Sequence, residues 1–166
     1  METKMATALN KDYQYDANNI PDGSKYKIYI VVSEWNSLIS TSLENGAKDT
    51  LINAGVNPEN IKVFKVPGSF ELIYGAKIAQ HQKPDAVIAI GSVIQGETKH
   101  FDFICQAVTH GIKDLNLQSE IPVIFCVLTD NNLQQAKDRS GGKHGNKGIE
   151  AAIAALKMAN FREQDP

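Results

Sequence analysis

The sequence predicts a single α/β domain in which a four-stranded parallel sheet lies between two layers of helices. Four short apolar runs rich in Val and Ile alternate with segments whose apolar residues recur every three or four positions. Strands that lack a polar face are typical of parallel sheets, which helices cover on both sides. Strand–helix alternation then implies right-handed crossovers and a three-layer sandwich.

The apolar runs mark the strands, and we expect each of them to be buried on both faces. The first is KIYIVVS, followed by IKVFKV, AVIAIGS and PVIFCVLT. Their ranges are 27–33, 61–66, 86–92 and 122–129.

Helical periodicity fills the segments between and after these strands. Apolar residues recur from Ile39 to Ala54 and stop at Gly55, a residue type that commonly ends helices. The other predicted helices cover 68–80, 101–115, 133–139 and 149–159. We expect a polar, flexible arm over 1–24, one domain over 25–162 and a short tail over 163–166.

Composition excludes several classes of protein. The 166 residues carry a formal net charge of -2 without a basic cluster, which argues against a nucleic-acid partner. No apolar run is long enough to span a membrane, and the N-terminus lacks the apolar core of a secretory signal. We therefore expect a cytoplasmic protein, in which Cys105 and Cys126 are reduced thiols rather than a disulfide.

Polar and aromatic residues follow all four predicted strands. Ligands of open parallel sheets bind beyond the carboxyl ends of the strands, so we expect these residues to meet at one edge. They are Glu34, Trp35 and Asn36 after the first strand, 67–71 after the second, 96–100 after the third and 129–131 after the fourth.

Several of these residues also have a purely structural interpretation. Trp35 could cover the edge of the core, and Asn36 and Asn131 could each cap the helix that follows. Ser69 and Glu71 could stabilise the start of a helix in the same way. His100 could be an ordinary surface residue.

The residues nevertheless suggest one kind of ligand, a planar and hydroxylated molecule together with a phosphate. Trp35 suits stacking on a flat heterocycle, and Ser69 and Glu71 suit the hydroxyls of a polyol. Backbone amides of 96–98 at a helix start suit an anion, and His100 suits proton transfer.

The glycine-rich segment RSGGKHGNKG (139–148) is either a mobile loop or a means of bringing Arg139 and Lys147 to an anion. It lacks the spacing of a Walker A loop, and no G-x-G-x-x-G follows the first strand. No Cys or His pair has metal-ligand spacing, so we expect no metal site.

Five motifs follow one another along residues 26–161. They are Trp35-Asn36, VPGSFE (66–71), GSVIQGETKHFDF (91–103), PVIFCVLT (122–129), and QAKDR with GNKG (135–148). In this order and at this spacing they resemble the lumazine synthase family. The resemblance implies a flavodoxin-like domain and a transferase of riboflavin biosynthesis. Such an enzyme condenses 5-amino-6-(D-ribitylamino)uracil with 3,4-dihydroxy-2-butanone 4-phosphate into 6,7-dimethyl-8-ribityllumazine, without a cofactor.

The resemblance also implies the role of each site residue, with His100 as the proton-transfer residue. The ribitylaminouracil would contact Trp35, Asn36, Ser69, Phe70, Glu71, Ser92, Val93, Ile94, Phe125 and Lys147. The butanone phosphate would contact Glu97, Thr98 and Arg139. We expect only the backbone amide of Glu97 to contribute, because its carboxylate would repel phosphate.

The resemblance implies a homo-oligomer in which Phe125 reaches the site of a neighbouring subunit. A cyclic pentamer is expected, either alone, paired into a decamer or built into a sixty-subunit shell. The short connection between Arg139 and Lys147 favours the shell over the free pentamer. Riboflavin synthase is a candidate partner.

Two other functions are alternatives at this point. A non-catalytic flavin or lumazine carrier could keep the same pocket, although storage requires neither His100 nor Arg139. A flavodoxin-like electron-transfer or signalling domain would need a phosphate-binding loop or an acidic cluster after the first strand, and SEWNS (33–37) provides neither.

Overall fold

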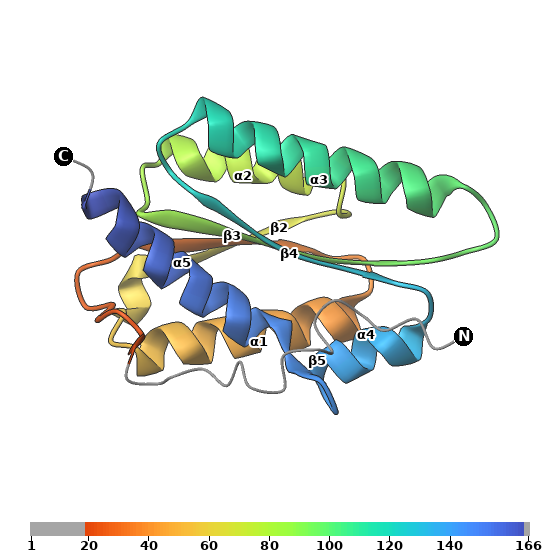
Figure 1. The fold of residues 1–166 in the computed structure, drawn as a ribbon, viewed down its shortest axis with the longest axis horizontal. Coiled ribbons are helices and arrows are strands. Elements are labelled where there is room, and N and C mark those ends of the chain that lie inside the picture. The colour runs from red at the N-terminus through yellow and green to blue at the C-terminus, as the bar shows by residue number, and fades with distance from the viewer. Residues whose placement is uncertain (1–18, 165–166) are drawn as a thin grey trace.

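A four-stranded parallel sheet lies between two helical layers in the computed structural model, which describes residues 19–164 (Figure 1). The strands are β1 (Ile28–Ser33), β2 (Ile61–Val66), β3 (Ala86–Ile94) and β4 (Val123–Asp130). Their order is β2-β1-β3-β4, and all three pairings are parallel. The predicted three-layer α/β architecture is confirmed.

Helices cover both faces of the sheet, with α2 and α3 on one face and α1 and α5 on the other (Figure 1). The helices are α1 (Ser37–Asn53), α2 (Leu72–His81), α3 (His100–Gln118), α4 (Leu133–Arg139) and α5 (Lys147–Glu163). A short 3₁₀ turn (Pro58–Asn60) precedes β2, and a small antiparallel hairpin joins β5 (Ser140–Gly142) to β6 (Gly145–Asn146). None of the helices within 19–164 is long and apolar enough to cross a membrane.

The two central strands, β1 and β3, bury nearly all of their side chains, because each of their faces packs against a helical layer. Val93 and Ile94, at the carboxyl end of β3, are partly exposed. In β1, Ile28, Ile30 and Val32 belong to the core under α1 and α5. Tyr29 and Val31 point the other way, into the core under α2 and α3. Removal of this apolar surface from water is the main stabilising contribution to such a sandwich.

The edge strands differ from the prediction that every strand is buried on both faces. In β2, Lys62 and Lys65 are exposed, and in β4 the Phe125 side chain is 42% exposed. The prediction was wrong for these two strands because they form the edges of the sheet, where the helical layers do not cover them completely.

The starts of two helices differ from the prediction. Gly68 to Glu71 form a turn, in which the Leu72 N–H donates to the Ser69 carbonyl (3.2 Å), so α2 starts at Leu72 rather than at residue 68. By contrast, α3 starts at His100, one residue before the predicted range 101–115. The amides of 96–98 therefore precede the helix instead of lying in its first turn.

The segment 139–148, whose role the sequence left open, forms the β5–β6 hairpin and the start of α5. Asn146 caps this helix, since its Oδ1 accepts a hydrogen bond from the Gly148 N–H (2.8 Å). Its Nδ2 donates to the Ser42 carbonyl of α1 (3.0 Å). One amide side chain therefore both caps α5 and fixes it against α1.

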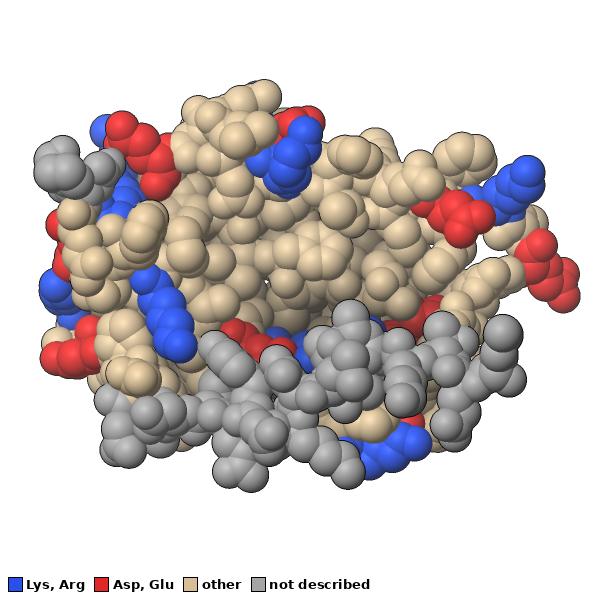
Figure 2. Space-filling view, in the orientation of Figure 1, with Lys and Arg blue, Asp and Glu red and all other residues tan. Residues whose placement is uncertain are grey.

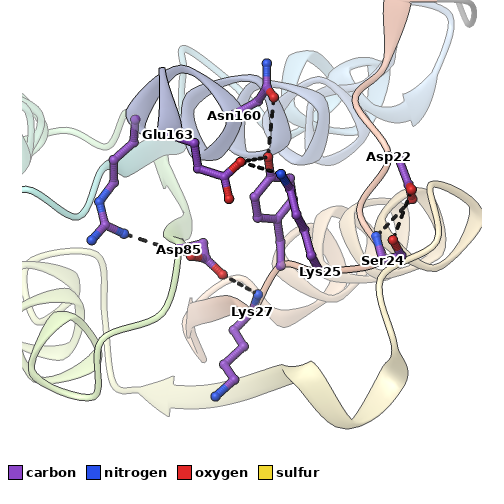
Figure 3. Close-up of polar contacts among 9 residues, drawn as sticks. Asp22, Ser24, Lys25, Lys27, Asp85, Asn160 and Glu163 are labelled. Atoms are coloured by element: carbon purple, nitrogen blue, oxygen red, sulfur yellow. Dashed lines mark hydrogen bonds and ion pairs between the residues drawn. The ribbon is translucent and has the colours of Figure 1, made fainter. Parts of the chain in front are cut away.

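Side-chain hydrogen bonds and an ion pair connect the segment before β1 to the end of α5 (Figure 3). The buried Tyr26 hydroxyl bonds to Glu163 (3.2 Å) and lies 3.4 Å from Asn160 Oδ1, and Lys25 pairs with Glu163. The arm predicted over 1–24 lies outside the described residues up to residue 18. Within its last part, the Gly23 N–H donates to the Ala54 carbonyl (2.7 Å).

The contact between α1 and α5 requires a glycine at position 148. A Cβ atom there would lie 2.0 Å from the Leu43 carbonyl oxygen, which is far inside van der Waals contact. We expect Gly148→Ala to lower the free energy of unfolding by at least about 1–3 kcal/mol, measured by urea denaturation. Gly96→Ala is the control, since a Cβ at Gly96 meets no described atom within 4 Å. Equal stability of both variants would contradict this account of the helix contact.

Candidate active site

A pocket of about 550 Å³ lies at the carboxyl ends of β1 and β3. We call it the Trp35 pocket. Nine of the predicted site residues line it, namely Trp35, Asn36, Ser69, Phe70, Glu71, Ser92, Val93, Ile94 and His100. Gly68 and Ile104 also line it. Gly68 was expected at this edge but was given no role, and Ile104 was not predicted, because a glycine in a turn and an isoleucine in a helical stripe carry no chemical signal of their own.

The inner wall of the Trp35 pocket is lined by serine hydroxyls. Ser69 and Ser92 are buried, and among the described residues the Ser92 Oγ has no hydrogen-bond partner. A Cβ at Gly91 would lie 2.6 Å from the Ser69 Oγ, so a glycine in β3 leaves room for that hydroxyl. The wall thus offers hydroxyl groups to a polar ligand.

The rim of the pocket is aromatic. Trp35 is 73% exposed and Phe70 is 52% exposed, so neither ring covers the edge of the core. Exposed rings beside a pocket are available to stack on a flat ligand. The structural interpretation of Trp35 is therefore not supported.

Asn36 adopts the left-handed conformation (φ 56°), and its side chain makes no capping hydrogen bond to α1. Its Nδ2 donates instead to the Ser92 carbonyl at the end of β3 (2.9 Å). Asn36 therefore joins the two strand ends that carry the pocket, and the helix-cap interpretation was wrong. The N-cap of α4 is Asn132 rather than Asn131, since the Asn132 Oδ1 accepts from the Gln135 N–H (2.9 Å).

Polar groups at two helix starts complete the site. The Glu71 Oε2 accepts a hydrogen bond from the Gly68 N–H (2.9 Å), which holds the carboxylate beside the turn before α2. His100 is the first residue of α3, and its N–H donates to the Thr98 Oγ1 (3.3 Å). Glu97 and Thr98 are exposed in the connection before α3 and line no described pocket.

Three of the five remaining predicted residues line a second pocket of about 460 Å³ beside β4 and the start of α5. We call it the Arg139 pocket, after the arginine that lines it. Phe125, Arg139 and Lys147 line it, and it shares no lining residue with the Trp35 pocket. Within one chain, the structure therefore separates the predicted site into two parts.

Two of the three cations that line the Arg139 pocket, Arg139 and Lys147, have a carboxylate partner, whereas Lys157 pairs with no carboxylate among the described residues. The Arg139 Nη1 donates to the Asp130 Oδ1 (2.9 Å), and the Lys147 Nζ lies 2.8 and 2.9 Å from the two carboxylate oxygens of Glu150. Burial, and then the positive charge of Arg139, lower the pKa of Lys147, while burial raises the pKa of Glu150. The sequence analysis assigned no role to Asp130 or Glu150.

The thiol in this pocket is not a reactive nucleophile. Burial raises the pKa of Cys126 to about 12, so the sulfur is protonated at neutral pH. Cys105 and Cys126 are both free, as predicted.

On the face drawn in Figure 2, charged side chains lie mainly around the margins of a broad uncharged surface, without a continuous basic area.

The chain matches the family model of 6,7-dimethyl-8-ribityllumazine synthase over residues 25–163. The chain belongs to this family. Among curated lumazine synthases, that of Flavobacterium johnsoniae is 62% identical over 161 residues, which cover 96% of this chain and 85% of that protein. The lumazine synthase of Christiangramia forsetii is 61% identical over 96% of both chains. That of Parabacteroides distasonis is 53% identical over 95% of this chain and 99% of its own length.

Proposed function

We propose that this chain forms 6,7-dimethyl-8-ribityllumazine from 5-amino-6-(D-ribitylamino)uracil and 3,4-dihydroxy-2-butanone 4-phosphate. The observation that carries the proposal is the Trp35 pocket, where aromatic rings, buried hydroxyls, a carboxylate and an imidazole from separate elements line one cavity. Relatives that bear this enzyme's name are up to 62% identical over nearly the whole chain.

In this proposal the Trp35 pocket binds the ribitylaminouracil. The uracil ring stacks on Trp35, and the backbone of 92–94 at the end of β3 contacts the polar edge of the ring. Hydroxyls of the ribityl chain bond to Ser69 and to the Glu71 carboxylate, which the Gly68 amide already holds in place. Phe70 closes the apolar side.

The phosphate of the second substrate binds near Glu97 and Thr98 and is contacted by Arg139. These groups do not meet within one chain, because Arg139 lies in the other pocket together with Phe125 and Lys147. We therefore propose that the Arg139 pocket of a neighbouring subunit completes the Trp35 pocket. A head-to-tail interface of this kind repeats around a ring.

The assembly that we propose is a homo-oligomeric ring, a pentamer by the family resemblance, which can build a sixty-subunit shell. The exposed edge of β4 carries Phe125, which is the ring expected to enter the neighbour's site. We further propose that the enzyme works in the cytoplasm, with riboflavin synthase as its candidate partner.

The reaction needs alignment and proton transfer more than a strong nucleophile. The uracil amine attacks the ketone, and loss of a first water gives an imine. The imine then eliminates phosphate, and ring closure with loss of a second water gives the product. Holding the two substrates in register removes several kcal/mol from the barrier in principle. His100 lines the pocket at the start of α3 and is proposed to move protons, which contributes roughly 10²–10⁴-fold at most.

Steady-state formation of the product, followed by its absorbance, tests this function with two variants. We expect Arg139→Ala to weaken butanone phosphate by ~2–4 kcal/mol and to spare the ribitylaminouracil, because a charged hydrogen-bond donor is lost from one subsite only. His100→Ala should lower turnover by about 10- to 100-fold and leave both substrate affinities nearly unchanged.

A wild-type chain that binds both substrates without forming product would exclude the enzyme and favour a carrier. Equal losses of affinity for both substrates in Arg139→Ala would show that Arg139 supports the fold instead.

Trp35 is the single tryptophan of the chain, so its emission reports directly on the Trp35 pocket. We expect the lumazine product or riboflavin to quench most of this emission when it binds, because a flat ring stacked on the exposed indole gives efficient quenching. Titration of the wild-type chain measures the effect, and N-acetyltryptophanamide controls for absorption by the ligand. Unchanged emission at saturation would refute the stacking.

A further inference from the structure

A buried ion pair lies directly behind the Arg139 pocket. Asp130 is the last residue of β4 and Arg139 is the last residue of α4. The Asp130 side chain is only 2% exposed and that of Arg139 is 19% exposed, with 2.9 Å between Oδ1 and Nη1. Carboxylates are rarely buried to this extent, because desolvation disfavours the charged form unless a cation or hydrogen-bond donors compensate it.

The position of the Asp130 carboxylate is fixed by the sheet. Asp130 pairs with Ile94 in the β3–β4 register, and its carbonyl accepts a hydrogen bond from the Gln95 N–H (2.9 Å). Arg139 sits at the end of a seven-residue helix that precedes the β5–β6 hairpin. The pair therefore connects a rigid strand end to a short surface helix.

Asp130 itself does not line the Arg139 pocket, whereas Arg139 does. The contact between them uses one N–H of a guanidinium that has five. Donors therefore remain available for an anion on the pocket side. The other carboxylate of the region, Glu150, lines the pocket directly and pairs with Lys147.

Long arginine side chains lose considerable rotamer freedom when they bind a ligand, and this loss weakens binding. A partner that holds the guanidinium before the ligand arrives reduces that cost. Asp130 meets this requirement, because its carboxylate is buried, its backbone is held by the strand pairing, and it does not line the pocket that Arg139 lines.

We propose that Asp130 is a positioning residue for the phosphate subsite, which holds the Arg139 guanidinium in the orientation that binds the butanone phosphate. This inference rests on the proposed function. It assigns to Asp130 a hydrogen-bonding role that acts through Arg139, without contact to either substrate.

Three substitutions at position 130 test the proposal by steady-state kinetics with each substrate varied in turn. Asp130→Ala and Asp130→Ser remove the acceptor that reaches Arg139, so KM for the butanone phosphate should rise about 10- to 100-fold. At saturation kcat should stay within about twofold, and so should KM for the ribitylaminouracil, because the lost interaction serves binding of one substrate. The serine variant keeps a polar group at the buried position and serves as the alternative if the alanine variant does not fold.

Asp130→Asn should restore KM to within about threefold of wild type, since the amide Oδ1 can still accept the Arg139 hydrogen bond. Asp114→Asn is the matched control for loss of one acidic charge, because Asp114 is an exposed residue of α3 that pairs with Lys113. Inhibition by inorganic phosphate gives an independent readout. Its inhibition constant should rise in the alanine and serine variants by the same factor as KM.

A double-mutant cycle with Arg139→Ala completes the test. If Asp130 acts through Arg139, then Asp130→Ala should change KM by less than about twofold in the Arg139→Ala background. An unchanged KM in Asp130→Ala, an asparagine variant as weak as alanine, or fully additive effects in the cycle would each overturn the proposal. Absence of lumazine formation by the wild-type chain would instead refute the proposed function itself.

Discussion

The fold depends on the parallel pairing of the two central strands, β1 and β3, which are buried except for Val93 and Ile94 at the carboxyl end of β3. Every residue from Ile28 to Val32 in β1 is at most 5% exposed, and helices contact both faces. Parallel pairing directs the carboxyl ends of the strands to one edge of the sheet, and each strand must then leave through a connection to a helix. The residues that follow β1, β2 and β3 therefore gather around one pocket, although roughly 30 to 70 positions of sequence separate one group from another.

The order of the parallel strands in the sheet also explains why one chain carries two separate pockets. The Trp35 pocket lies over the centre of the sheet, between the ends of β1 and β3, whereas the Arg139 pocket lies beside the edge strand β4. A strand at an edge exposes one side to a partner, and Phe125 is exposed there. The Arg139 pocket faces outward with Arg139 and Lys147 held by carboxylates, which suits it to complete a neighbour's site.

Sequence reasoning predicted the sheet, five helices and the strand-end residues, because apolar periodicity and strand-end position report directly on burial. It could not predict that Gly68 to Glu71 form a turn, since the competition between a turn and a first helical turn depends on the Glu71 contact with the Gly68 amide. The alternative that Asn36 caps α1 was wrong, because its side chain bonds instead to Ser92, 56 residues away in the sequence. Asp130 was expected at the ligand edge, but neither Asp130 nor Glu150 was given a role. The importance of each carboxylate comes from the cation with which it pairs in the folded chain, Arg139 for Asp130 and Lys147 for Glu150.

Mixed oligomers test the central claim, that two subunits share each site, most directly. His100→Ala damages the Trp35 pocket and Arg139→Ala damages the Arg139 pocket, so neither variant alone has an intact site. If sites are shared, co-expression in equal amounts combines an intact half from each chain in about one quarter of the sites, and activity approaches one quarter of wild type. If each chain carries its own whole site, the mixture shows only the mean of the two low activities, and the shared-site account is contradicted.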